Sequence, residues 1–367
     1  MDIKEQLISL TPYQPGKPIE EVKKEYGLER IVKLASNENP YGCSPVVTET
    51  LLNNISKVAV YPDGYAGELR DTLARHLDVE PSQIIFGNGS DEVLQIICRA
   101  LLSPGSNTVM ATPTFPQYKH NAIIEGAEIR EVPLLNGEHN LEGMLNEIDE
   151  HTKVVWICSP NNPTGNYVTD KNLLSFIEKV PSTTLVVIDE AYYEYVVAND
   201  YPETVPLLER FPNMMILRTF SKIYGLASLR IGYGIGNADF IKKIEPVREP
   251  FNTSRFSQVA ATAAISDQMF VDKCKLKNRE GIQQFIDFCD SHHVNYYPTQ
   301  GNFILLDFAP LQGNEVFQYL LKHGYIVRSG NALGFPTCIR ITVGCKEDNE
   351  EIISILSKML KVKEQVS

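Results

Sequence analysis

Residues 185–195 read LVVIDEAYYEY, an apolar run that ends at Asp189 and Glu190. The run is short, rich in Val, Ile and Leu and nearly continuous in apolarity, which is typical of a strand covered on both faces. Similar runs are QIIF (83–86), NTVMA (107–111), KVVWIC (153–158), MMILR (214–218) and IGYGI (231–235). Helical patterns alternate with them, such as 90–102 and 169–180, for which Ser90 and Thr169 are the expected N-caps. The sequence therefore predicts an α/β fold with a mostly parallel sheet flanked by helices.

The chain has 367 residues, more than one hydrophobic core of about 250–300 residues usually organises. The last hundred residues read as helix, strand, helix, strand, helix, which predicts a smaller α+β domain. We expect a loop-rich N-terminal arm at 1–35, a large domain at 36–265 and a small domain at 266–367.

The net charge of −12 argues against nucleic-acid or anionic-membrane partners, which require a basic surface. The acidic N-terminal stretch does not resemble a signal peptide, and no apolar run approaches the ~18 residues of a membrane span. The seven cysteines are scattered without a C-x-x-C pair, which indicates reduced thiols and a cytoplasmic protein. No metal site is expected.

A polar turn follows each of five core strands: GNGSDE (87–92), TPTFPQY (112–118), SPNNPTG (159–165), DEAYYEY (189–195) and TFSK (219–222). Any one of them could be an ordinary loop. Ligands of open α/β sheets bind outside the carboxyl ends of the strands, so five such turns with different chemical groups favour a shared site.

The first turn has two glycines before a helix start, a pattern that suits a phosphate group. Arg230 could clamp the same phosphate, and the hydroxyls of Thr219 and Ser221 could donate to it. Ser90 by itself is equally explained as a helix cap.

Asp189 ends a buried strand, where a carboxylate needs a cation or hydrogen-bond donors. A helix cap or a salt bridge would explain it; so would a heteroaromatic nitrogen that it keeps protonated. Tyr192 and Asn162 could donate hydrogen bonds to the same ligand, although NNPTG also forms a plain turn. Tyr118 could stack on a flat ring, although a core tyrosine is the more frequent case.

Lys222 follows the apolar run 214–218, with no acid close in sequence. A lysine amine in a desolvated pocket with cationic neighbours has a lowered pKa and reacts with aldehydes. Pyridoxal phosphate is the cofactor that needs an amine, a phosphate cradle, an acid for a pyridine nitrogen and a stacking ring.

SPNNPTG, VVIDEAYYEY and TFSKIYGLASLRIGY (219–233) resemble the cofactor-binding motifs of fold-type-I aminotransferases. LTPYQPGKP (10–18), LASNENPYG (34–42), YPDG (61–64), GNGSDE, PTFPQY and IRITVG (339–344) resemble the histidinol-phosphate aminotransferase branch of that family. The resemblance covers essentially the whole chain, and no motif is broken.

The resemblance implies that Lys222 carries the cofactor covalently, that Asp189 holds the pyridine nitrogen protonated, and that Tyr192 and Asn162 contact the ring hydroxyl. It places Tyr118 on the ring. The phosphate would be bound by the Ser90 and Asp91 amides, Thr219, Ser221 and Arg230. Tyr61 would reach the phosphate in a neighbouring subunit, which implies a homodimer with shared sites and an arm that packs on the partner and the small domain.

For the substrate, the resemblance implies that Arg340, Arg328 and Tyr13 bind its phosphate, with Asn37 also in contact. An arginine on the apolar strand of Arg340 also favours a bidentate anion, with an interdomain salt bridge as the alternative for both arginines. The implied reaction is transamination between L-histidinol phosphate and 2-oxoglutarate in histidine biosynthesis. An aromatic-amino-acid aminotransferase and a phospho-amino-acid decarboxylase would use the same cofactor residues. A non-catalytic cofactor sensor would normally carry a DNA-binding extension.

Overall fold

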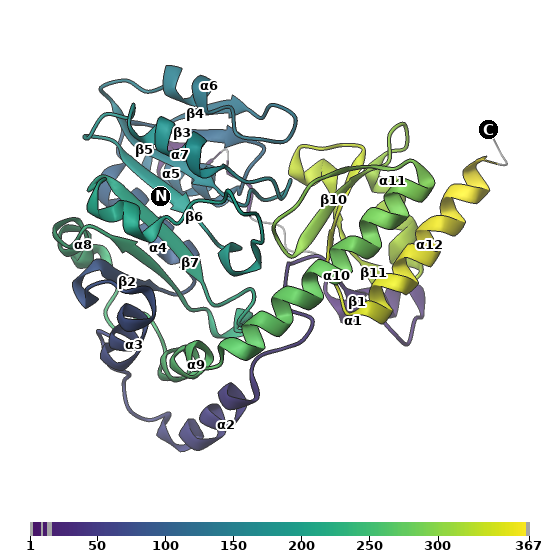
Figure 1. Cartoon of the computed structure of the whole chain (residues 1–367), viewed down its shortest axis with the longest axis horizontal. Helices are drawn as coiled ribbons and strands as arrows, with labels where there is room; N and C mark the ends of the chain where they lie inside the picture. Colours follow the sequence, from purple (N-terminus) through teal and green to yellow (C-terminus); the bar gives the residue numbers. More distant parts are fainter. Residues whose placement is uncertain (1–2, 9, 13–16, 365–367) are drawn as a thin grey trace.

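The computed structural model describes residues 3–8, 10–12 and 17–364. Two lobes are joined by a long helix, α10 (Gln268–His292), as Figure 1 shows. Within the described residues no helix is long and apolar enough to cross a membrane, and all seven cysteines are free thiols.

The larger lobe is built on a seven-stranded sheet with the order β2-β8-β7-β6-β5-β3-β4. Its strands are Ile84–Gly87 (β2), Asn107–Thr112 (β3), Glu128–Pro133 (β4), Thr152–Cys158 (β5), Leu185–Asp189 (β6), Met214–Thr219 (β7) and Gly232–Gly236 (β8). Only β8 runs against the others, between β2 and β7. The predicted, mostly parallel sheet is confirmed. The sequence did not predict β4, because its polar residues Glu128, Arg130 and Glu131 mask the strand pattern at the sheet edge.

Each inner strand alternates its side chains between two cores, as the pleat of a strand requires. In β6, Val186 and Ile188 belong to one core, and Leu185 and Val187 to the other. The first core also takes residues from α2 (Pro45–Asn54), α3 (Gly67–Leu77), α6 (Leu141–Asn146), α7 (Asp170–Ile177) and α9 (Arg255–Ser266). The second takes residues from α4 (Ser90–Leu101), α5 (Gln117–Glu125) and α8 (Ala238–Ile244). The sheet is therefore covered on both faces.

The expected helix starts hold to within one residue. Thr169 is the N-cap of α7 and accepts a hydrogen bond from the Asn172 amide. Gly89, with φ of 84°, occupies the cap of α4, so Ser90 is the first helical residue rather than the cap.

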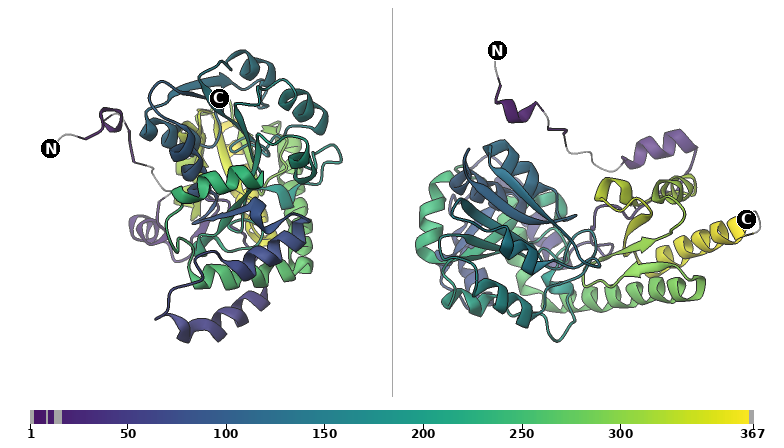
Figure 2. Two further views of the ribbon diagram at one scale, coloured as in Figure 1. Left: turned by 90° about the vertical axis from the view of Figure 1, so that its left-hand side faces the viewer. Right: turned by 90° about the horizontal axis from the view of Figure 1, so that it is seen from above.

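The smaller lobe contains an antiparallel sheet in the order β12-β13-β10-β9. Its strands are Asn295–Tyr297 (β9), Phe303–Asp307 (β10), Arg328–Ser329 (β12) and Cys338–Thr342 (β13). Helices α10, α11 (Gly313–Lys322) and α12 (Lys346–Glu364) accompany it, and α10 and α12 lie side by side in Figure 2.

Residues 19–35 lie on the smaller lobe, whereas Glu5–Leu7 (η1) lies against α5 of the larger lobe, where Gln6 Nε2 donates to the Ile124 carbonyl at 3.2 Å. Val32–Lys33 (β1) pairs in parallel with Tyr325–Ile326 (β11), and Val22 of α1 (Ile19–Tyr26) shares a core with Ile326. The chain then crosses to the larger lobe. The boundaries 1–35, 36–265 and 266–367 remain a prediction.

Candidate active site

A cavity of about 900 Å³ lies where β2, β3, β5, β6 and β7 end, and residues of both lobes line it. The predicted site residues on its wall are Asn37, Ser90, Asp91, Asn162, Asp189, Tyr192, Thr219, Ser221, Lys222, Arg230, Arg328 and Arg340. The five polar turns thus meet at one place. They do so because their strands all run in the same direction.

Lys222 lies three residues beyond the end of β7 and lines the cavity. Its Nζ donates to the Ser36 carbonyl at 3.3 Å. Burial, and then the positive charge of Arg340, lower the pKa of Lys222 to about 8. A substantial fraction of this amine is therefore neutral, and so nucleophilic, near physiological pH.

Asp189 is 4% exposed, and burial raises its pKa to about 6. The hydroxyl of Tyr118 donates to its Oδ2 at 2.6 Å and the amide of Ala191 to its Oδ1 at 3.2 Å; these bonds hold the carboxylate in place. A buried carboxylate of raised pKa is suited to a cationic partner that enters with a ligand.

The structure does not place Tyr118 on the cavity wall, so its predicted role as a stacking plate is wrong. Tyr118 is in the first turn of α5 and faces the sheet, where its ring stacks on Trp156 at a centroid distance of 4.9 Å. Phe115, which precedes α5, lines the cavity instead. The motif PTFPQY offers two aromatic rings, and only the start of the helix decides which of them faces the ligand.

Tyr192 lies in a network that links the two lobes. Its Oη accepts hydrogen bonds from Asn37 Nδ2 at 2.9 Å and Asn162 Nδ2 at 3.4 Å. Arg340 of β13 donates to Asn162 Oδ1 and to the Ala35 carbonyl. Burial raises the pKa of Tyr192, so its hydroxyl stays protonated and can donate to a ligand. Asn37 holds a left-handed backbone with φ of 57°, a conformation that recurs at binding sites.

An anion cradle lies at the start of α4. Arg230 Nη1 donates to Ser221 Oγ at 3.2 Å, and Arg230 Nη2 pairs with Asp91 at 3.2 Å. A Cβ on Gly89 would lie 2.5 Å from Arg230 Nη2, so only glycine lets the turn approach this guanidinium. Thr219 Oγ1 accepts from the Ser221 amide at 3.1 Å and orders the neighbouring turn.

Besides Tyr118, two further predicted residues are not placed on the wall of this cavity. Tyr13 falls outside the described residues. Tyr61 is 76% exposed on the surface, where it stacks on Phe251 at 4.8 Å, and it does not line the cavity of its own chain. The further wall residues Phe115, Gln117, His120 and Cys158 were not predicted as site residues. Of these, Phe115 and Gln117 lie within the family motif PTFPQY.

The family model for "Aminotransferase class I and II" matches residues 29–356. The chain belongs to this aminotransferase family. It is 64% identical over 366 residues to a histidinol-phosphate aminotransferase of Geobacillus sp. (strain WCH70), with all of both chains covered. It is 62% identical to one of Bacillus subtilis (strain 168), covering 98% of this chain and 100% of that protein.

Among solved structures, the histidinol-phosphate aminotransferase from Sinorhizobium meliloti in complex with pyridoxal-5'-phosphate superposes with a TM-score of 0.89. It is 26% identical in sequence, over 98% of each chain. The fold-type-I class expected for this aminotransferase is thereby confirmed.

The residues of this aminotransferase fit pyridoxal phosphate. The cavity is lined by Lys222, whose pKa is lowered, by the buried carboxylate of Asp189 and by the aromatic ring of Phe115. Arg230 lines it too and lies beside the Gly89 turn.

Proposed function

We propose that this aminotransferase moves the amino group of L-histidinol phosphate to 2-oxoglutarate, with pyridoxal phosphate as cofactor, in histidine biosynthesis. The products would be imidazole acetol phosphate and glutamate. The chemistry is supported by one observation: Lys222 and Asp189 line the same cavity, together with Arg230 of the anion cradle. The choice of substrate is supported by the names of relatives at 62–64% identity.

In the proposed site, Lys222 would hold the cofactor through its amine. The cofactor supplies an aldehyde that takes up amines and a ring that delocalises the electrons of a broken C–H bond. The Lys222 amine would also be the base that removes the proton from the substrate α-carbon. A base already positioned at the reacting carbon acts with high effective concentration.

The other wall residues orient the two ligands. Asp189 would hold the ring nitrogen of the cofactor in its protonated form, and Tyr192 and Asn162 would bind the ring oxygen. Arg230, Ser221, Thr219 and the first amides of α4 bind the cofactor phosphate.

Arg328 and Arg340 bind the anionic end of the substrate from the smaller lobe, with Asn37 and Tyr13 as further contacts. Because 2-oxoglutarate must use the same site, these arginines serve a phosphate in one half of the cycle and a carboxylate in the other.

We further propose a cytoplasmic homodimer with shared sites, in which Tyr61 reaches the partner's cofactor phosphate. Exposed apolar side chains near Tyr61 support this: Leu52, Ile55, Val58, Val60 and Phe251 are all more than two-fifths exposed. Surfaces of this kind mark interfaces.

A panel of amino donors tests the proposal. Glutamate formation from 2-oxoglutarate is measured with histidinol phosphate, phenylalanine and tyrosine, together with release of carbon dioxide. Histidinol phosphate should give the highest kcat/KM. Arg328→Ala should reduce its kcat/KM far more than that of phenylalanine. Preference for phenylalanine would favour the aromatic aminotransferase, and carbon dioxide release the decarboxylase.

A further inference from the structure

The Gly87–Ser90 turn of the anion cradle packs closely against the backbone of β8 on its inner side. A Cβ on Gly232 of β8 would lie 2.3 Å from the Ser90 nitrogen, and a Cβ on Gly87 would lie 2.7 Å from the Gly89 carbonyl oxygen. The turn therefore sits against β8 with no room for side chains. This packing limits how far the turn can move inward, but it does not hold the turn from the outside.

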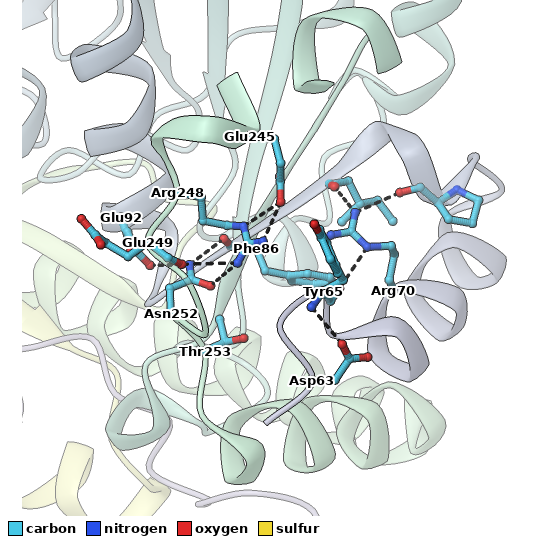
Figure 3. Close-up of polar contacts among 12 residues, drawn as sticks. Asp63, Tyr65, Arg70, Phe86, Glu92, Glu245, Arg248, Glu249, Asn252 and Thr253 are labelled. Atoms are coloured by element: carbon cyan, nitrogen blue, oxygen red, sulfur yellow. Dashed lines mark hydrogen bonds and ion pairs between the residues drawn. The ribbon is translucent and has the colours of Figure 1, made fainter. Parts of the chain in front are cut away.

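The outer side of the turn is held by two polar side chains, Glu92 and Asn252, shown in Figure 3. Glu92 Oε2 accepts a hydrogen bond from the Asn88 amide, in the middle of the turn. Asn252 Nδ2 donates to the same Glu92 oxygen at 2.8 Å and to the Phe86 carbonyl at 3.0 Å, just before the turn. The two side chains thus hold the turn in its middle and just before its start.

Asn252 is itself fixed by an ion pair. Its Oδ1 accepts from Arg248 Nη1 at 2.9 Å, and Arg248 Nη2 pairs with Glu245 at 2.6 Å. The Arg248 side chain is only 8% exposed, so this pair is well ordered compared with ordinary surface pairs. Figure 3 shows the chain of contacts running from Glu245 through Arg248 and Asn252 to Glu92.

Neither Glu92 nor Asn252 lines the cavity. We propose that they are positioning residues, which hold the Gly87–Ser90 turn in its anion-binding shape from outside the site. The inference rests on the proposed function, in that the anion is the phosphate of pyridoxal phosphate. An acceptor for the Asn88 amide keeps that N–H turned outward, and the amides of Ser90 and Asp91 at the helix start remain directed at the phosphate.

Comparing pyridoxal phosphate with pyridoxal isolates this effect, because pyridoxal lacks the phosphate. Dissociation constants of both compounds are measured by absorbance and fluorescence on cofactor-free protein. Asn252→Ala should weaken pyridoxal phosphate about tenfold, as loss of hydrogen bonds to a partly buried charged group would do, and leave pyridoxal unchanged. Asn213→Ala is the matched control, since Asn213 also donates to two carbonyls, those of Thr184 and Pro181, away from the cavity.

A charge exchange tests the contact directly and does not depend on the alanine variant folding. Asn252→Asp places a carboxylate against Glu92 and should weaken pyridoxal phosphate more than Asn252→Ala does. Adding Glu92→Gln restores a hydrogen bond with donor and acceptor reversed, and should recover part of the loss.

Equal weakening of pyridoxal and pyridoxal phosphate, or no recovery in the exchanged pair, would overturn the inference while leaving the proposed function intact. Failure of the unaltered protein to bind pyridoxal phosphate would overturn the proposed function and the inference with it.

Discussion

At the scale of single residues, Lys222 and Asp189 share an unfavourable position in the cofactor-free protein. Both are ionisable groups on the wall of a cavity that removes them from water. Burial raises the pKa of Asp189 and lowers the pKa of Lys222, so it favours the neutral form of each. A ligand with an aldehyde and a protonated ring nitrogen relieves both. We therefore propose that this unfavourable position favours binding of the cofactor by these two residues.

The lowered pKa of Lys222 gives a prediction for cofactor attachment. The neutral amine is the attacking form, so the rate constant for reaction of cofactor-free protein with pyridoxal phosphate should rise with pH and level off above about 8. Stopped-flow absorbance between pH 6 and 9.5 measures it. A rate that still rises tenfold per pH unit at 9.5 would show an ordinary lysine.

The same shifts predict that the cofactor-free protein gains stability when a charge is removed. The folded pKa of Lys222 lies below its unfolded value, so its charged form costs stability at pH below about 8, on the order of 3 kcal/mol. Lys222→Met should raise the thermal midpoint at pH 7, and exposed Lys171→Met should not.

For Asp189 the folded pKa lies above the unfolded value, so its contribution to stability falls as pH rises from about 4 to 6.

The measurement for these two charges is thermal unfolding of cofactor-free protein. Asp189→Asn should flatten the loss of stability between pH 4 and 6. Unchanged thermal midpoints in both variants would mean that neither charge lowers the stability of the folded protein.

Single residues also mark how far the sequence could be interpreted. Lys222 and Asp189 were identifiable because a charged residue after an apolar strand needs an explanation. The sequence could not show which of Phe115 and Tyr118 lines the cavity, because an aromatic ring can pack in a core or against a ligand. Asn252 gave no signal, since Phe86 and Glu92, its partners at the turn, are distant in sequence.

At the scale of secondary-structure elements, the pleat sorts successive residues between opposite faces. Asp189 continues the face of Leu185 and Val187, on the side of Tyr118, while Glu190 turns to the other core. On the neighbouring strand Arg218 points the same way as Glu190, and the two form an ion pair at 2.8 Å. The strand ends that carry Asp189 and Thr219 are therefore tied together from behind the site.

This pair should be important to folding stability. Glu190 is fully buried and also accepts from Thr204 at 2.9 Å; Arg218 is 4% exposed and lies over the Tyr193 ring at 3.5 Å. Arg218→Met leaves a buried carboxylate without its cation and should cost roughly 3–5 kcal/mol in urea unfolding. Adding Glu190→Leu should return much of it. Additive losses in the double variant would contradict a direct coupling.

The elements were predictable where apolarity is continuous, as in the inner strands of the sheet. Strand β4 was not, since it is an edge strand with charged side chains and reads as a polar loop. The pairing of Glu190 with Arg218 depends on which strands are neighbours, and this follows from the fold and not from spacing.

At the scale of the whole molecule, the site needs both lobes. Arg340 reaches from the smaller lobe to Asn162 of the larger, and Thr342 accepts from the Asn37 amide at 2.9 Å. The sequence indicated two lobes from its length and from the different pattern of its last hundred residues. It could not show that β1 pairs with β11, because a two-residue strand has no pattern of its own.

The proposed shared sites predict complementation between subunits. Lys222→Ala chains lack the amine but carry Tyr61, and Tyr61→Ala chains lack the tyrosine but carry Lys222. Mixed dimers assembled from the two would contain one intact site, and their activity at limiting cofactor should exceed the sum of the parent proteins. Activity equal to that sum would place Tyr61 outside any shared site.

We propose above that Lys222 is the residue that binds the cofactor. Borohydride reduction of the protein loaded with pyridoxal phosphate, followed by peptide mapping, tests it most directly. We expect one labelled peptide, with the label on Lys222, and no label there after prior incubation with an excess of histidinol phosphate. A label on another lysine, with Lys222 unmodified, would contradict it.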